Sequence, residues 1–206
     1  MEHYDLIVIG SGPAGETGAA QAAQFGKRVA MIECSANVGG AGINGTVPSK
    51  TLREAALYFS GLRQRGLFGI DYALKENLSL KDLMQREQVA VENEQKIIES
   101  NIQRHNITLI HGKASLKDAH SVQVTSPDGE LQISGDIILI ATGSSPYNPP
   151  EISVDGKIIY DSDSVLHMKR IPKTMAIIGA GVIGTEYASL FAALGVQVML
   201  IEPRER

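Results

Sequence analysis

The sequence is poor in the residues that mark several classes of protein. Its 206 residues include a single cysteine, Cys34, which excludes an intrachain disulfide and a multi-thiolate metal cluster. The five histidines show no metal-ligand spacing, so no metal site is expected. The net charge is only −4 with scattered basic residues, and neither nucleic acid nor an anionic membrane is an expected partner. The N-terminus has no basic leader and no long apolar run, which favours the cytoplasm.

What the sequence does contain is a glycine-rich turn inside a βαβ pattern. Residues 5–33 read as strand, turn GSGPAG, alanine-rich helix and second strand. Gly10 permits a tight turn, Gly12 lets the backbone approach a pyrophosphate, and Gly15 lets the helix meet the strand. Glu33, 23 residues after Gly10, can accept hydrogen bonds from ribose hydroxyls. The segment therefore predicts a dinucleotide site.

A second turn repeats this pattern near the C-terminus. The sequence GAGVIG at 179–184 has Glu202 again 23 residues after its first glycine. Two independent matches predict two dinucleotides. The acid favours NAD, whereas Arg204 and Arg206 could attract the 2′-phosphate of NADP, so the choice between these nucleotides stays open.

The segments between the two turns have weaker patterns. They predict helices over 49–64 and about 80–105, a small antiparallel meander within 107–134, a buried strand at 137–140 and a proline-rich break. The second βαβ unit runs from 176 to 201 and ends before the further strands that a doubly wound domain needs. We therefore expect a truncated second domain.

The motifs together resemble a known family. The runs GSGPAG, VGGAGINGTVPSK, ILIATGSSP, IYDSDS and GAGVIGTEYAS look like the two-dinucleotide flavoprotein disulfide reductases, and GTVPSKTLRE and IYDSDSVL look most like their soluble, Si-specific pyridine nucleotide transhydrogenases. The resemblance implies an α/β fold with a Rossmann-like three-layer FAD-binding domain, containing a parallel sheet and a small antiparallel meander, over 1–148. A linker over 149–172 and the start of a Rossmann-like NAD(P)-binding domain over 173–206 follow.

The resemblance also assigns the site residues, with FAD on the first motif and NAD(P)H as substrate on the second. The FAD positions are Gly10, Gly12, Pro13, Ala14, Gly15, Glu33, Cys34, Gly39, Gly40, Gly42, Thr46, Lys50, Ala114, Ala141, Thr142 and Gly143. The NAD(P) positions are Gly179, Gly181, Val182, Ile183, Gly184, Glu186 and Glu202. The catalytic positions are Lys50 and Glu186, which pair near flavin N5 in relatives, and Thr46.

The sequence departs from the disulfide reductases where they carry two redox cysteines. Gly42 stands at the first cysteine position and Thr46 at the second, and the loop between them is one residue shorter. Neither side chain can form a disulfide or a thiolate. Cys34 does not restore the pair, because it follows Glu33 at the ribose end of the cofactor. Transhydrogenases usually keep the first cysteine, so Gly42 departs from them as well.

These residues and the resemblance predict an FAD-dependent enzyme that passes hydride from NADPH to NAD⁺ without a dithiol. The alternative in the same family is a thiol-free NAD(P)H dehydrogenase with a quinone, a dye or oxygen as acceptor. A third possibility is that these 206 residues are a non-catalytic nucleotide-binding piece. The resemblance implies that the full-length form is a homodimer and that this piece alone is inactive.

Overall fold

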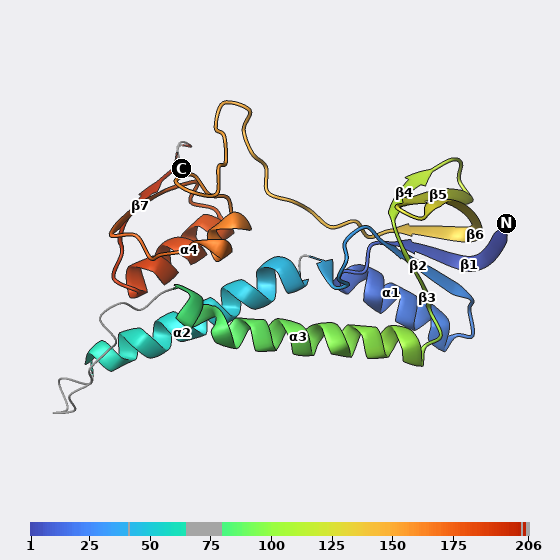
Figure 1. Cartoon of the computed structure of the whole chain (residues 1–206), viewed down its shortest axis with the longest axis horizontal. Coiled ribbons are helices and arrows are strands. Elements are labelled where there is room, and N and C mark those ends of the chain that lie inside the picture. Colours follow the sequence, from blue (N-terminus) through green and yellow to red (C-terminus); the bar gives the residue numbers. More distant parts are fainter. Residues whose placement is uncertain (41, 65–79, 203, 205–206) are drawn as a thin grey trace. The chain divides into compact units, whose positions relative to one another are not determined.

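The computed structural model describes residues 1–40, 42–64, 80–202 and 204, with the backbone alone given for 44, 59–64 and 80–87 (Figure 1). The chain divides into two compact units. The first contains Met1–Thr46 and Val91–Ser145, and the second contains Val47–Ala90 and Pro146–Arg206. Each unit carries one of the two glycine turns.

The first unit is built on a six-stranded sheet of mixed direction. In chain order its strands are β1 (Glu2–Ile9), β2 (Val29–Glu33), β3 (Thr108–His111), β4 (Lys113–Leu116), β5 (Ser121–Ser126) and β6 (Gly129–Ile140). Their spatial order is β3-β2-β1-β6-β5-β4. The pairs joining β3, β2, β1 and β6 are parallel, and those joining β6, β5 and β4 are antiparallel. The expected α/β class with a parallel sheet and an antiparallel meander is confirmed.

Strand β6 joins the parallel and antiparallel parts of this sheet. It pairs with β5 through Gly129–Ser134 and with β1 through Ile133–Ile140, so it is one strand of 12 residues. The expectation of two separate segments here was wrong, as was the placement of 108–111 in the meander, because β3 pairs in parallel with β2. Alternating hydrophobicity does not reveal the direction of the partner strand, which the tertiary fold decides.

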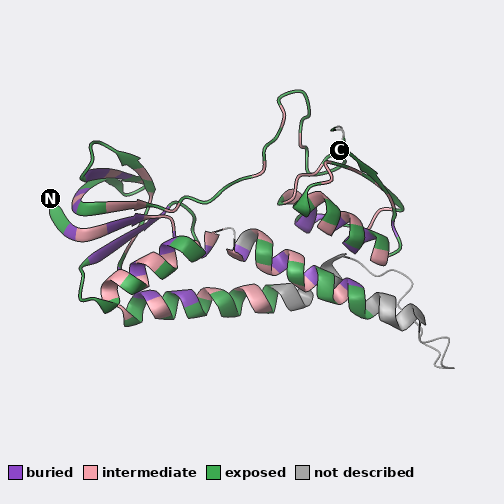
Figure 2. Cartoon of the chain, turned by 180° about the vertical axis from the view of Figure 1, so that it is seen from behind, coloured by how far each residue is buried: buried purple, intermediate pink, exposed green. Residues whose placement is uncertain are grey.

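Two apolar cores cover the two faces of this sheet. On one face, helix α1 (Pro13–Gln24) and the last part of α3 (Leu80–Arg104) bury Ala19, Ile98 and Ile102 against β1 and β2. On the other face, Val122 and Val124 of β5 pack on residues of the parallel strands. Figure 2 shows the buried positions along these strands. Helices, parallel sheet and meander therefore form the three expected layers.

The second unit contains the second βαβ segment and helix α2. Strands β7 (Thr174–Ile178) and β8 (Gln197–Ile201) are parallel, and α4 (Val182–Ala193) connects them. Helix α2 (Val47–Gln64) contacts α4 through Leu52 and Ala56. Val165, Leu166 and Met168, around a 3₁₀ turn within the segment expected as a linker, belong to the same core. Among the described helices, none is both long enough and apolar enough to span a bilayer.

Candidate dinucleotide-binding sites

The first turn follows β1, and its glycines are required by close backbone contacts. Gly10 has a φ of +104°, and a Cβ there would lie 2.3 Å from the carbonyl oxygen of Ala141. A Cβ on Gly15 would lie 1.9 Å from the carbonyl oxygen of Gly10. Gly12 is different, because among the described atoms a Cβ there would approach only the carbonyl oxygen of Gly39, at 4.0 Å. Gly12 thus offers an open backbone surface, as the approach of a pyrophosphate requires.

Helix α1 begins directly at this turn. Its N-cap is Gly12, and no side chain caps it, while Pro13 occupies the first turn. The N–H groups of a first helical turn have no partner inside the helix, and the helix dipole gives this end a partial positive charge. Ala14 and Gly15 belong to that turn. The geometry therefore suits an anionic group such as a diphosphate.

Glu33, the last residue of β2, is buried and fully hydrogen-bonded. One carboxylate oxygen accepts from the Ser11 N–H at 3.0 Å and the Ser11 hydroxyl at 2.5 Å. The other accepts from the Ser35 N–H at 2.8 Å and weakly from the Cys34 thiol at 3.6 Å. Burial by itself would raise the pKa of Glu33, but these hydrogen bonds outweigh it and hold the pKa below its ordinary value. Glu33 is therefore a charged, oriented acceptor.

The segment after β2 carries the remaining glycines of the predicted FAD site. Gly39 donates its N–H to the Ser11 hydroxyl at 3.0 Å, and a Cβ on Gly39 would collide with Ile43. Gly42 starts a single π-helical turn, η1 (Gly42–Thr46), which ends at the exposed Thr46. A Cβ on Gly42 would meet the Pro13 ring at 3.3 Å, so the turn needs only a small adjustment to accept a side chain there.

The chain after β6 returns to the first turn. The Ala141 N–H donates to the Ile9 carbonyl at 2.8 Å. The expected residues Ala141, Thr142 and Gly143, which follow β6, therefore start beside the carboxyl end of β1. Glu33 lies at the carboxyl end of β2. Gly40, in the segment after β2, has a φ of +51°, in the left-handed region that favours glycine. The structure thus brings these residues to one edge of the parallel sheet, where ligands bind in open α/β folds.

A pocket of about 360 Å³ lies in the same unit, close to Glu33. Cys34, Ser35, His111 and Lys113 are among its lining residues. Ala114, expected near adenine, is the residue after Lys113 in β4 and is half-buried. The exposed Cys34 thus lines a pocket, in addition to contacting Glu33.

The second turn repeats the backbone geometry of the first. The Gly179 N–H donates to the Ile201 carbonyl at 2.7 Å, as the Gly10 N–H does to Ile32 at 2.8 Å. A Cβ on Gly184 would lie 1.9 Å from the Gly179 carbonyl oxygen, the same distance as in the first turn. Among the described residues, no atom lies within 4 Å of a Cβ on Gly181. Helix α4 starts at Val182 and, like α1, has no side-chain cap.

The acid of the second turn has a different partner from that of the first. Glu202 accepts from the Ala180 N–H at 3.0 Å and pairs with the Arg204 guanidinium at 3.0 and 3.2 Å. These bonds, from the Arg204 side chain foremost, lower the pKa of Glu202 to about 2. Arg206 lies outside the described residues. A cation thus lies on the carboxylate at the position where a Rossmann domain distinguishes NAD from NADP.

A pocket of about 620 Å³ in the second unit is lined by α2 and α4. Val182 and Glu186 of α4, its N-cap Gly181 and Arg53 of α2 are among the lining residues. Val182 is 85% exposed, and Ile183 after it is also exposed. Lys50 lies one turn before Arg53 and is exposed. Lys50 and Glu186 are both described, and no ion pair joins them.

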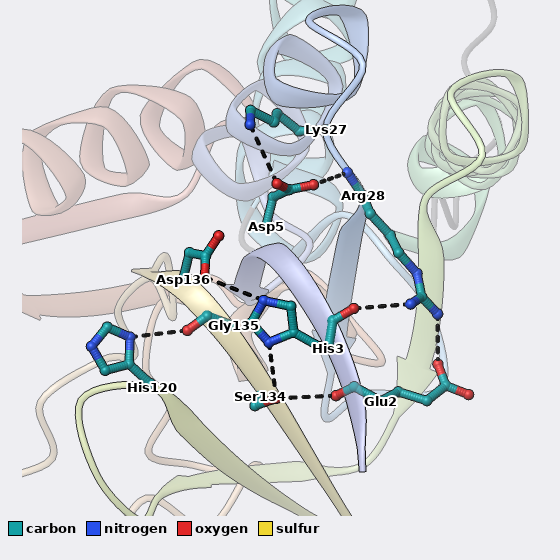
Figure 3. Close-up of polar contacts among 9 residues, drawn as sticks. All are labelled: Glu2, His3, Asp5, Lys27, Arg28, His120, Ser134, Gly135 and Asp136. Atoms are coloured by element: carbon teal, nitrogen blue, oxygen red, sulfur yellow. Dashed lines mark hydrogen bonds and ion pairs between the residues drawn. The ribbon is translucent and has the colours of Figure 1, made fainter.

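The opposite edge of the parallel sheet is held by surface contacts (Figure 3). Arg28 bridges to Glu2 and the His3 carbonyl, and its N–H donates to Asp5 at 2.7 Å. His3 lies between the Ser134 hydroxyl at 3.1 Å and the Asp136 carboxylate at 3.2 Å. This Ser–His–Asp arrangement is no hydrolase site, because His3 and Asp136 are 60% and 65% exposed and line neither pocket described above. It fastens β1 to β6.

Sequence reasoning missed two residues of these sites, Ser11 and Arg53. Ser11 is a variable position inside the glycine motif, and only its full burial and its contact with Glu33 reveal a role. In the sequence, Arg53 has only the pattern of an exposed helical residue. Its place in the pocket could not be predicted without knowing that α2 packs beside α4.

The contact at Gly15 leads to a test of the first turn. Gly15→Ala should lower the free energy of unfolding by about 3 kcal/mol, since the new methyl group would collide with the Gly10 carbonyl oxygen. The control Gly45→Ala adds a methyl group with no described atom within 4 Å and should change the value by less than about 1 kcal/mol. Urea unfolding measures the free energy of unfolding of both variants, and equal losses would contradict the steric requirement for glycine at position 15.

The lowered pKa of Glu33 predicts a dependence of stability on pH. The carboxylate stabilises the fold above its ordinary pKa of 4.5, and this contribution is lost as the pH falls through the lower folded-state pKa. Glu33→Gln should therefore flatten the acid limb of a plot of Tm against pH. The control Glu151→Gln removes an exposed carboxylate and should leave that limb in place. Parallel curves for Glu33→Gln and the native protein would contradict the prediction.

Comparisons with known proteins agree with this geometry. The pyridine nucleotide-disulphide oxidoreductase family matches residues 4–206. Soluble pyridine nucleotide transhydrogenases of Mycobacterium tuberculosis and Colwellia psychrerythraea are each 41% identical to this chain, over 100% and 98% of its length. The chain spans 44% of the length of each of these relatives.

Solved structures give the same result. The HOCl-induced flavoprotein disulfide reductase RclA from Escherichia coli, in its Cu(II) complex, is 34% identical with a TM-score of 0.82, and the match covers 98% of this chain and 43% of that one. LpdA from Mycobacterium tuberculosis is 25% identical with a TM-score of 0.86, and the match covers 100% of this chain and 46% of that one. The chain therefore belongs to the pyridine nucleotide-disulphide oxidoreductase family.

Proposed function

We propose that the whole protein is an FAD-dependent, Si-specific transhydrogenase that transfers hydride between NADPH and NAD⁺. The observation that carries this proposal is the duplicated glycine turn, with the same backbone contacts and the same spacing to an acid at Glu33 and Glu202. The names of the 41%-identical relatives support the choice of reaction. Because this chain spans 44% of those relatives, the activity is proposed for the whole protein.

The first turn suits FAD. Gly12 leaves its backbone open to a diphosphate, the uncapped start of α1 supplies N–H donors, and Glu33 is an oriented acceptor for ribose hydroxyls. When bound, the flavin would supply the chemistry of accepting a hydride from one nicotinamide and returning it to another. Ala114 and the residues 141–143 would border the same cofactor.

The second turn and its pocket suit the pyridine nucleotides. Gly181 gives a diphosphate access to the start of α4, and Val182 is exposed at the mouth of the pocket that Glu186 also lines. Glu186 would orient Lys50, whose cation would stabilise negative charge near the flavin ring. Reduced and oxidised nucleotides would use this one site in turn.

No redox-active disulfide takes part in the proposed reaction. Gly42 and Thr46 carry no thiol, and the only cysteine, Cys34, contacts Glu33 at the ribose end of the first site. Gly42 also sets the chain apart from transhydrogenases, which usually keep the first cysteine. This observation favours a second candidate, a thiol-free NAD(P)H dehydrogenase with a quinone, a dye or oxygen as acceptor. For either activity we propose a cytoplasmic homodimer as the full-length form.

The test is anaerobic transfer of hydride from NADPH to an NAD⁺ analogue by the whole protein loaded with FAD, followed by absorbance. One NADPH consumed for each analogue reduced is the expected result. A flavin that NADPH reduces beside an analogue that stays oxidised would contradict the transhydrogenase and favour the dehydrogenase. The 206-residue chain alone should show no turnover, and a rate equal to that of the whole protein would contradict this part of the proposal.

Arg204 leads to a prediction about nucleotide preference. Arg204→Gln should weaken NADPH binding about tenfold, since a charged hydrogen bond to the 2′-phosphate is lost, and should leave NADH binding within about threefold. The control Arg170→Gln removes an exposed arginine outside the second turn. Calorimetric titration measures the affinity for each nucleotide. An equal loss of affinity for NADPH and NADH would contradict the role of Arg204.

A further inference from the structure

We propose that Ser11 is a positioning residue of the FAD site, which orients Glu33 and the segment around Gly39 before the cofactor binds. The inference rests on the assignment of FAD to the first turn. Ser11 occupies the variable second position of GSGPAG and is completely buried. Its hydroxyl contacts both the Glu33 carboxylate at the end of β2 and the Gly39 N–H in the segment that follows.

Both the hydroxyl and the backbone N–H of Ser11 form hydrogen bonds in the site. Its hydroxyl donates to the Glu33 carboxylate at 2.5 Å and accepts from the Gly39 N–H at 3.0 Å. Its backbone N–H donates to the same Glu33 oxygen at 3.0 Å. The end of β2 and the glycine segment after it are therefore joined through one side chain.

This arrangement leaves one acceptor position on the second carboxylate oxygen of Glu33 only weakly filled. The oxygen bound by Ser11 has two strong donors, whereas the other has the Ser35 N–H and the long contact of 3.6 Å to the Cys34 thiol. A thiol is a weak donor, and a ribose hydroxyl can replace it at small cost. Ser11 thus fixes the direction in which Glu33 offers its second oxygen.

The second turn has the same backbone hydrogen bond but no hydroxyl group at the position of Ser11. Ala180 occupies the position of Ser11, and its N–H still donates to Glu202 at 3.0 Å. Glu202 is instead held by the exposed Arg204. The comparison separates the two contributions, because the backbone bond is common to both turns and the hydroxyl is particular to the first. It also shows that alanine is compatible with this turn.

The test is equilibrium titration of the apoprotein with FAD, read by flavin fluorescence, and with ADP, read by calorimetry. Ser11→Ala should weaken FAD binding about tenfold, because the Gly39 N–H loses its acceptor and Glu33 one donor. ADP should lose affinity by the same factor, since the effect arises at the adenosine end. The control Ser126→Ala removes an exposed serine hydroxyl bonded in a hairpin turn, and its FAD affinity should stay within about twofold.

A double-variant comparison asks whether Ser11 acts through Glu33. Once Glu33→Gln is present, adding Ser11→Ala should weaken FAD binding by less than about threefold further. Full additivity of the two losses, or an unchanged FAD affinity in Ser11→Ala, would overturn the proposal. Ser11→Cys keeps the space and a weak donor and should give an intermediate loss, which tests the same point should the alanine variant not fold. Absence of FAD binding by the native protein would instead contradict the proposed function.

Discussion

In both glycine turns the carbonyl oxygen of the first glycine lies where a β-carbon would stand on the third. The distance of 1.9 Å is the same at Gly15 and at Gly184, so only glycine allows the helix to begin against the preceding strand. Because of this close approach, α1 and α4 each begin at the carboxyl end of the strand before them. The uncapped N–H groups of each helix therefore lie at this edge, where the acid that follows each turn also lies.

The two turns then differ in how the acid is held, and that difference matches what each site would do. Glu33 is buried and bonded by Ser11, which suits a cofactor that stays in place. Glu202 is paired with the exposed Arg204, and a surface ion pair exchanges its partners at small cost. Such a pair suits substrates that arrive and leave, some with a 2′-phosphate and some without.

Gly42 and Thr46 occupy the positions where redox cysteines were expected from the family resemblance. Gly42 borders Pro13, which is in the first turn of α1, and a side chain there would need only a small shift, so crowding does not explain the glycine. The segment forms a π-helical turn directly before α2. Nothing in the structure accounts for a glycine at this position, and hydride transfer between nicotinamides through a flavin, as proposed, does not require a thiol there.

Much of the fold could be predicted from the sequence because it depends on local rules. The glycine spacings, the acids at Glu33 and Glu202 and the helices α2 and α3 depend on turns, caps and periodicity within short segments. The parallel partner of β3 and the continuity of β6 could not be predicted, because strand pairing joins residues far apart in the chain.

The same division holds for the sites. The sequence by itself determined which positions of each turn carry no side chain, which is a steric requirement, and that an acid follows each first glycine by 23 residues. Only the tertiary structure decided that Ser11 contacts Glu33 and Gly39, that Arg53 lines a pocket with Glu186, and that Arg204 covers Glu202. Those contacts depend on side-chain directions and on the packing of separate elements, which no local pattern encodes.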